Sequence, residues 1–317
     1  MSRSSIPKPP HGSLEWLRIR HRDEVGLPVV SASEAAAVHG MHRFKSKYGL
    51  AADKLAPEPE VTETNRAMER GNRLEPVIIE WAADDLGIEL VSPSIMYQYH
   101  DGFASMVATL DAVDAKSPLA MPDVVVEIKT YNREWSPAHM PAYWWFQGVH
   151  QAVCAGVDTI HWAIFDNTLD LHIHEQHVEM EDKEMHIAAV GEFCKQVSTG
   201  TIPSDWQATY AEVSAHALDK DGTIELDDHI QLIDSLRELQ AEKKQLNDRE
   251  DELKAQLGIV LDGCDSGTVD GKEVVTWKQR ARTSFDAKRF KQDHPDLHDQ
   301  YQTSSTYRVM SVKGGNK

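Results

Sequence analysis

Residues 106–130 constrain this chain more than any other stretch, because two β-rich segments within it each carry acidic side chains. The second segment reads Val-Val-Val-Glu-Ile-Lys-Thr over 124–130, and side chains alternate in direction along a strand. Glu127 and Lys129 therefore share one face, and Asp111 on the preceding segment can meet them across a hairpin. Two carboxylates beside a lysine suit a hard divalent cation next to a water that must lose a proton.

An isolated Glu-x-Lys is more often a solvated ion pair on a sheet surface than a catalytic site. The rest of the chain decides between the two interpretations. Its 317 residues, 41% hydrophobic and 26% charged, suit one large or two modest globular domains. No apolar run approaches the ~18–20 residues of a membrane span. The three distant cysteines form no disulfide or zinc pattern, so we expect a cytoplasmic protein.

The net charge of −18 argues against a nucleic-acid partner, but the charge is unevenly distributed. Residues 272–317 hold ten Lys/Arg and five Asp/Glu, a balance of +5, whereas residues 1–205 hold 17 and 30, a balance of −13. An acidic body with a locally basic groove can still bind DNA. Charge alone therefore excludes neither class of partner.

Hydrophobic periodicity predicts mixed helices and strands over residues 13–205. Residues 1–12 have no signal-peptide core and are expected to form a flexible lead. Asp101-Gly102 and Asp166-Asn167 are expected to form hairpin turns. Helices are predicted over 14–22, 64–86, 141–155 and 182–197, and strands over 95–100, 103–108, 159–165 and 169–180.

Residues 206–317 are predicted to form a C-terminal extension with a different pattern. Leucines recur every seven residues from Leu232 to Leu253, which predicts a long amphipathic helix over 228–257, either a coiled-coil arm or a helix on the body. Gly258 is expected to end it. The extension is completed by a predicted hairpin, a basic helix and a strand, at 268–277, 285–294 and 307–312.

Six short motifs follow one another along the chain, and their order is more specific than any one of them. They are Trp16-Leu-Arg-Ile-Arg20, Ser31-Ala-Ser-Glu34, Gly71-Asn-Arg-Leu-Glu75, Thr109-Leu-Asp111, Glu127-Ile-Lys129, and Gln147 followed by Gly156. This order and spacing resemble the phage-type alkaline exonucleases, the lambda exonuclease and YqaJ-type viral recombinase family of the PD-(D/E)XK nuclease superfamily. The resemblance covers residues 14–203, and it implies a protein encoded by a phage or prophage and present in the cytoplasm of a bacterial host cell.

The resemblance implies an α/β (α+β) fold with a central mixed β-sheet flanked by helices and a helical C-terminal extension. It implies that Asp111, Glu127 and Glu75 bind one or two Mg²⁺ ions, with Mn²⁺ as a substitute, and that the carbonyl of Ile128 is a further ligand. Lys129 would orient the attacking water or help to deprotonate it. Phosphodiester hydrolysis independently needs such neutralisation of developing charge.

Members of the family hold the 5′-terminal phosphate with an arginine, a serine and a glutamine. The matching positions here are Arg20, Ser33, Thr109 and Gln147, and the resemblance also assigns Gln147 to the catalytic set. Leu110 replaces the proline of the literal motif, which removes no ligand. Asp114 and Asp123 are spare carboxylates that stay open as further ligands.

The leading functional hypothesis is a Mg²⁺-dependent 5′-to-3′ exonuclease that acts on the ends of linear double-stranded DNA. The 3′ single strand it leaves would pass to a single-strand annealing protein for homologous recombination. A homo-oligomer, a trimer by family resemblance, is expected. Two alternatives stay open: an endonuclease of restriction or resolvase type on the same fold, and a non-catalytic module that binds DNA ends.

Overall fold

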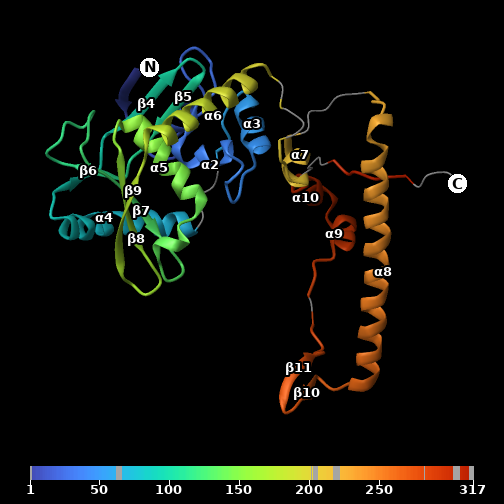
Figure 1. Ribbon diagram of the computed structural model, residues 1–317. Helices are drawn as coiled ribbons and strands as arrows, with labels where there is room; N and C mark the ends of the chain where they lie inside the picture. Colours follow the sequence, from blue (N-terminus) through green and yellow to red (C-terminus); the bar gives the residue numbers. More distant parts are fainter. Residues whose placement is uncertain are drawn as a thin grey trace. The chain divides into compact units, whose positions relative to one another are not determined.

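The computed structural model of the protein describes residues 2–61, 66–200, 202, 206–216, 222–281, 283–302 and 308–313. The chain forms two compact units, Met1–Ala217 and Leu218–Lys317 (Figure 1). Helix α7 (Tyr210–His216) packs on α3 (Lys47–Leu55), and its Glu212 accepts a hydrogen bond of 2.8 Å from the backbone N–H of Ser46. The first unit therefore extends past the boundary expected at 205/206.

Two mixed sheets form the centre of the first unit, so the predicted α/β class is confirmed. The four-stranded sheet has the order β1–β4–β5–β2, with the strands β1 (Ser2–Pro7), β4 (Ile95–Asp101), β5 (Ala104–Ala108) and β2 (Val30–Ser31). The five-stranded sheet has the order β3–β6–β7–β8–β9, with the strands β3 (Leu90–Val91), β6 (Ala112–Asp114), β7 (Val125–Thr130), β8 (Thr159–Phe165) and β9 (Leu171–His177). Residues 109–111 connect one sheet to the other. Both predicted hairpins are present, as β4–β5 and β8–β9.

Helices cover the five-stranded sheet on both faces (Figure 1). Helix α4 (Arg66–Leu86) packs on β7, β8 and β9. Helix α5 (Ala142–Ala155) packs on β8 and also on the strands β4 and β5 of the four-stranded sheet. Helix α6 (Met180–Ser198) packs on α5 and β5. The shorter elements of this unit are α1 (Leu14–Ile19), η1 (Ala32–Glu34), α2 (Ala35–Val38) and η2 (Pro137–His139).

Strand β7 divides its side chains between the two helical layers. Val126 and Ile128 belong to the apolar cluster that includes Ile78 of α4, whereas Val125 belongs to the cluster formed with α5. Because side chains alternate along a strand, the odd-numbered residues of β7 face α5. Glu127 and Lys129 therefore lie on the α5 face, which confirms the shared face predicted from the sequence.

The N-terminal residues form a strand in place of the flexible lead expected over 1–12. Strand β1 pairs antiparallel with β4 from Ser2 opposite His100 to Pro7 opposite Ile95. The side chains of β1 are mostly exposed, so no hydrophobic pattern marks it as a strand. Backbone hydrogen bonds to the edge of β4 hold it, and sequence periodicity does not report such bonds.

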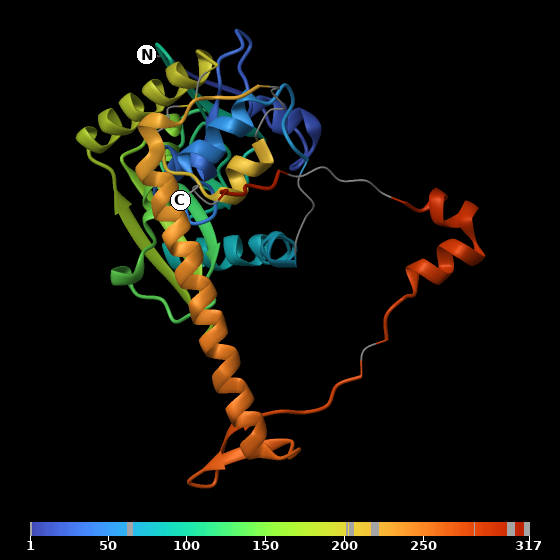
Figure 2. The same ribbon diagram turned by 90° about the vertical axis from the view of Figure 1, so that its right-hand side faces the viewer.

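The second unit is dominated by one uninterrupted helix, α8 (Ile230–Leu261), preceded by the short η3 (Asp227–His229) (Figure 2). Beyond it come the hairpin of β10 (Ser266–Val269) and β11 (Lys272–Thr276), then α9 (Ala287–Asp293) and α10 (Pro295–Gln300). The predicted long helix, hairpin and basic helix are thus confirmed. Among the described residues, none of the helices is both long enough and apolar enough to cross a membrane.

Two predictions for this unit are wrong. Helix α8 does not end at Gly258 but continues to Leu261, and the left-handed residue that terminates it is Asp262, with φ of +44°. Gly258 lies inside the last turns, next to the Trp277 ring. Residues 308–313 form no strand, and Tyr307 lies outside the described residues. A β-rich run forms a strand only when it pairs with another, and neither described strand of this unit, β10 or β11, pairs with it.

A chain of three histidines crosses the interior of the first unit. His39 Nε2 lies 2.9 Å from His186 Nδ1, and His186 Nε2 lies 3.0 Å from His150 Nδ1. His150 Nε2 lies 3.2 Å from the carbonyl oxygen of Val107, which can only accept. The proton of His150 therefore sits on Nε2, and each histidine in turn donates through Nε2. The chain is complete only when His150 and His186 are neutral, because each of them accepts through Nδ1.

Burial lowers the pKa of all three histidines, to about 3 for His150 and to about 4 for His39. A group with a lowered pKa in the folded state contributes stability above its unfolded pKa of 6.5 and loses it as the pH falls towards the folded value. We therefore predict that the free energy of unfolding falls between pH 7 and pH 5, by about 2 kcal/mol for each fully buried histidine.

Guanidine unfolding at several pH values, followed by tryptophan fluorescence, measures this dependence. His150→Gln should flatten the slope of stability against pH even if it lowers stability overall. His177→Gln, at an exposed position, is the matched control and should keep the wild-type slope. An unchanged slope in His150→Gln would contradict the account.

Candidate active site

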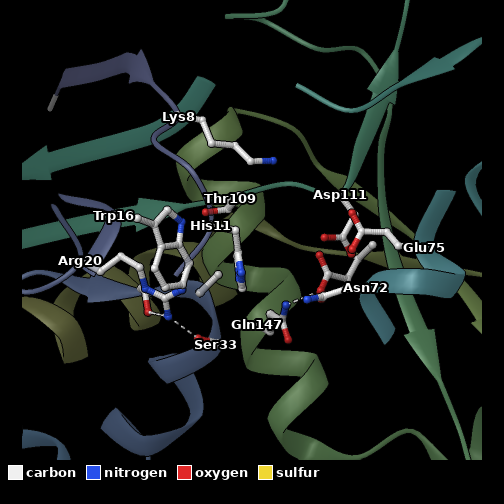
Figure 3. Close-up of a pocket in the computed structure, with 13 residues that line it drawn as sticks. Lys8, His11, Trp16, Arg20, Ser33, Asn72, Glu75, Thr109, Asp111 and Gln147 are labelled. Atoms are coloured by element: carbon white, nitrogen blue, oxygen red, sulfur yellow. Dashed lines mark hydrogen bonds between the residues drawn. The ribbon is translucent and has the colours of Figure 1, made fainter. Parts of the chain in front are cut away.

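One cavity of about 430 Å³ in the first unit gathers all the predicted site residues except Ile128 and Lys129. Arg20 and Ser33 lie at one end of this site cavity, Asp111 and Glu75 lie at the other, and Gln147 lies between them (Figure 3). The other residues that line it are Lys8, His11, Trp16, Ser31, Ala32, Asn72, Thr109 and Glu127. One end thus offers cationic and hydroxyl groups, and the other offers carboxylates.

Glu127 is the centre of the carboxylate end. It is only 3% exposed, and three side chains donate to it. Lys129 Nζ and Gln147 Nε2 bond to its Oε1, the lysine at 2.5 Å, and Gln151 Nε2 bonds to its Oε2 at 2.5 Å. Both glutamines lie on α5, one helical turn apart. They reach Glu127 because Glu127 lies on the face of β7 that packs against α5. The carboxylate is therefore fixed by the strand, its neighbour and the facing helix.

Asp111 stands at the junction of the two sheets, directly before β6. Its Oδ2 accepts a hydrogen bond of 2.8 Å from the backbone N–H of Ile128. Burial and the nearby charges of Glu127 and Glu75 raise its pKa well above the usual range, while Lys129 opposes them. Burial also raises the pKa of Glu75. These carboxylates repel one another, and a cation placed among them would relieve that repulsion.

The carboxylates at this end are the kind of ligand that a hard divalent cation prefers. Asp111, Glu127 and Glu75 line the cavity there, whereas Ile128, whose carbonyl is the fourth predicted ligand, does not line it. Within the described ranges, no three His, Cys, Asp or Glu side chains form a preassembled metal cluster. Asp111 and Glu127 are instead bonded to protein donors, so a bound cation would have to exchange with Lys129 and the backbone N–H of Ile128.

The two spare carboxylates lie in a different place. Ser117 Oγ donates to Asp123 at 3.0 Å and to Asp114 at 3.3 Å, and it accepts from the backbone N–H of Asp123. Neither aspartate lines the site cavity. Both carboxylates stabilise the loop between β6 and β7, so the structure gives them a structural role.

Arg20 dominates the opposite end of the site cavity. It donates to Ser31 Oγ and to Ser33 Oγ, each at 2.7 Å, and its guanidinium lies 3.9 Å from the centre of the Trp16 ring. Stacking on the ring and hydrogen bonds to two hydroxyls fix the planar group in one orientation. A guanidinium held in this way can form two parallel hydrogen bonds with a phosphate.

A buried ion pair holds the residues of this cationic end in place. Lys54 Nζ lies 3.0 Å from both carboxylate oxygens of Glu34 and donates to the carbonyl of Arg20 at 2.7 Å. Glu34 in turn accepts from the backbone N–H and the hydroxyl of Ser31, at 2.9 and 2.7 Å. Burial alone would raise the pKa of Glu34, but Lys54, Arg20 and Ser31 outweigh it and lower this pKa to about 2. The pair therefore stays ionised and fixes both Ser31 and the backbone of Arg20.

Several residues of the site were missed by sequence reasoning. Lys8 and His11 line the site cavity from the segment taken for a flexible lead, and Gln151 binds Glu127 from α5. The spacing of Gln147 and Gln151, one helical turn, was the only available signal for Gln151. Lys54 and Glu34 are twenty positions apart, and no local pattern pairs them.

Comparison with known proteins identifies the class of this site. Residues 15–158, which include every predicted site residue, match the family model of the YqaJ-like viral recombinase domain. The match confirms, for that range, the resemblance drawn from the ordered motifs, and it supports a nuclease.

Solved structures similar to this chain include an alkaline exonuclease, LHK-Exo, from Laribacter hongkongensis. It aligns with a TM-score of 0.44 and 19% identity, over 59% of this chain and 94% of that chain. The same enzyme in complex with dAMP gives a TM-score of 0.46 and 17% identity over the same shares. A phage-related exonuclease from Haemophilus somnus gives 0.37 and 13%, over 55% and 96%. None of the curated proteins matches this chain.

We predict that Lys54→Met lowers the free energy of unfolding at neutral pH by about 3 kcal/mol or more, because it leaves Glu34 charged and buried without its partner. Lys45→Met is the matched control. Lys45 pairs with Asp53 at a more exposed position, so its loss should cost less than about 1 kcal/mol.

The double variant Glu34→Gln/Lys54→Met completes a thermodynamic cycle measured by urea unfolding. It should be more stable than the sum of the two single losses predicts, because neither charge is left alone. Strictly additive losses would show that the pair does not act as a unit.

Proposed function

We propose that the protein is a Mg²⁺-dependent 5′-to-3′ exonuclease that hydrolyses one strand of linear double-stranded DNA from its end. One observation carries the proposal: a single cavity joins a fixed guanidinium and hydroxyl groups to a buried group of carboxylates with a lysine. A terminal phosphate held at the first end would align the adjacent phosphodiester bond with the second. Internal DNA has no terminal group to occupy the first end.

At the phosphate end, we assign binding of the 5′-terminal phosphate to Arg20, Ser33, Thr109 and Gln147. The fixed guanidinium of Arg20 supplies charge, and the hydroxyls of Ser33 and Thr109 supply directed donors. Gln147 lies between the two ends and donates to Glu127, so it can link phosphate binding to the chemistry.

At the carboxylate end, Asp111, Glu127, Glu75 and the Ile128 carbonyl would hold one or two Mg²⁺ ions, or Mn²⁺ in their place. The bound ion would lower the pKa of a water ligand and neutralise charge on the scissile phosphate. Burial alone would lower the pKa of Lys129, but Glu127 and Asp111 outweigh it and raise this pKa above the usual range. Lys129 therefore keeps its proton near neutral pH and acts as a hydrogen-bond donor, and we assign it to orienting the attacking water.

The product of this reaction is a duplex with a 3′ single-stranded overhang. Such an overhang is the substrate of a single-strand annealing protein in phage-type homologous recombination, and we propose a protein of that class as the partner. The family resemblance also favours a homo-oligomeric enzyme, a trimer in lambda-type members.

Digestion of one DNA sequence in linear and covalently closed circular form tests the proposal. With Mg²⁺, the linear form should be degraded from its 5′ ends while the circle stays intact, because the circle offers no terminal phosphate. Nicking or cutting of the circle would support the endonuclease instead. Absence of cleavage with Mg²⁺ or Mn²⁺ would support a module that only binds DNA ends.

Lys129→Ala and Asp111→Asn should each lower the rate on linear DNA by at least about 10³-fold without loss of the folded state. Asp84→Asn, at an exposed position on α4, is the matched control and should retain the wild-type rate. Circular dichroism verifies the fold of each variant. Metal-dependent cleavage at the wild-type rate by either site variant would contradict the site assignment.

A further inference from the structure

Helix α8 exposes an apolar stripe that no described part of its own unit covers. We define the leucine seam as Leu232, Leu236, Leu239, Leu246, Leu253 and Leu257. Five of its members are between 47% and 72% exposed, and Leu236 alone is half-buried. The seam follows a seven-residue repeat along a helix of about 48 Å, which is the pattern that packs one helix against another.

The repeat assigns each residue of α8 to a position relative to the seam. The first apolar position, a, is occupied by Leu236, Lys243, Glu250 and Leu257, and the second, d, by Leu232, Leu239, Leu246 and Leu253. Positions g, which flank the seam beside a, hold Glu242 and Arg249. Two charged residues thus interrupt the seam, and their signs are opposite.

A parallel pair of α8 helices would place like charges together. Each a residue then faces its own copy, so Lys243 would meet Lys243 and Glu250 would meet Glu250 of the other helix. Flanking contacts run from g to the next e position, which would bring Arg249 against Lys254. In a parallel pair, Lys243, Glu250 and Arg249 would therefore each lie next to a residue of like charge.

An antiparallel pair places opposite charges together. Each a residue is then level with a d residue, so Lys243 lies level with the partner's Leu246 and about 6 Å along the axis from the partner's Glu250. Flanking contacts run from g to g, which brings Glu242 against the partner's Arg249. The two-fold axis repeats both contacts.

We propose that α8 pairs in antiparallel orientation with α8 of a second copy of this chain through the leucine seam. The alignment that matches Lys243 with the partner's Leu246 also matches Leu232 with the partner's Leu257 and Leu236 with the partner's Leu253. Its two-fold axis passes between residues 244 and 245, close to the middle of Ile230–Leu261, so the two helices overlap along nearly their whole length. In the single chain, Glu250 pairs with Lys254 and Arg249 pairs with Glu252, both at exposed positions.

Cysteine cross-linking of the full chain tests the orientation. Leu232→Cys and Leu257→Cys are made separately in a chain in which the exposed Cys264 is replaced by serine; Cys154 and Cys194 are buried. Under mild oxidation, a mixture of the two variants should form covalent dimers that contain one chain of each. Neither variant should cross-link with itself, because its two cysteines would lie about 38 Å apart. Self-cross-linking of either variant, or no dimer in the mixture, would overturn the proposal.

Charge reversal provides a second test, measured by sedimentation of the full chain at several concentrations. Arg249→Glu should raise the dissociation constant of the pair about tenfold, because it sets Glu242 against a glutamate on both sides of the axis. Glu242→Arg/Arg249→Glu should restore the wild-type value, and Asp248→Arg on the outer face should not change it. A parallel pair predicts tighter association of Arg249→Glu through Lys254, and either tighter or unchanged association would overturn the proposal.

Discussion

The alternation of side chains along β7 is the constraint on which the site depends. Val126 and Ile128 pack towards α4, and Val125 packs towards α5, so the strand is clamped between two apolar layers. Glu127 and Lys129 are thereby committed to the α5 face. A shift of one residue in register would turn both away from the cavity and bury their charges in the α4 layer, at a large cost in free energy. The core therefore fixes the geometry of the chemistry.

The two ends of the site cavity are stabilised in opposite ways. At the phosphate end, the buried pair of Lys54 and Glu34 satisfies its own charges and leaves the guanidinium of Arg20 free to meet an anion beyond the two serines. At the carboxylate end, Asp111 is buried close to Glu127, and burial and repulsion by that carboxylate raise its pKa. A phosphate suits the first environment and a divalent cation the second.

The parts of the site that lie close in sequence were predictable. Strand alternation gave the shared face of Glu127 and Lys129, and the order of six motifs gave the fold class and the other predicted residues that line the cavity. The ion pair of Lys54 and Glu34 was not predictable, because only tertiary packing brings α3 beneath η1. Strand β1 was missed because its mostly exposed side chains carry no hydrophobic pattern. Conversely, a β-rich run at 308–312 was mistaken for a strand because composition cannot report whether a neighbouring strand exists.

The central claim is that Arg20 recognises the terminal phosphate that aligns the DNA for cleavage. The most direct measurement compares initial digestion rates on linear duplexes with 5′-phosphate and 5′-hydroxyl ends, for the wild type and for Arg20→Gln. Arg18→Gln, on the same helix but paired with the exposed Glu58, is the control. The account predicts that the wild type and Arg18→Gln prefer the phosphorylated end and that the ratio of rates falls to about one in Arg20→Gln. An unchanged ratio in Arg20→Gln would contradict it.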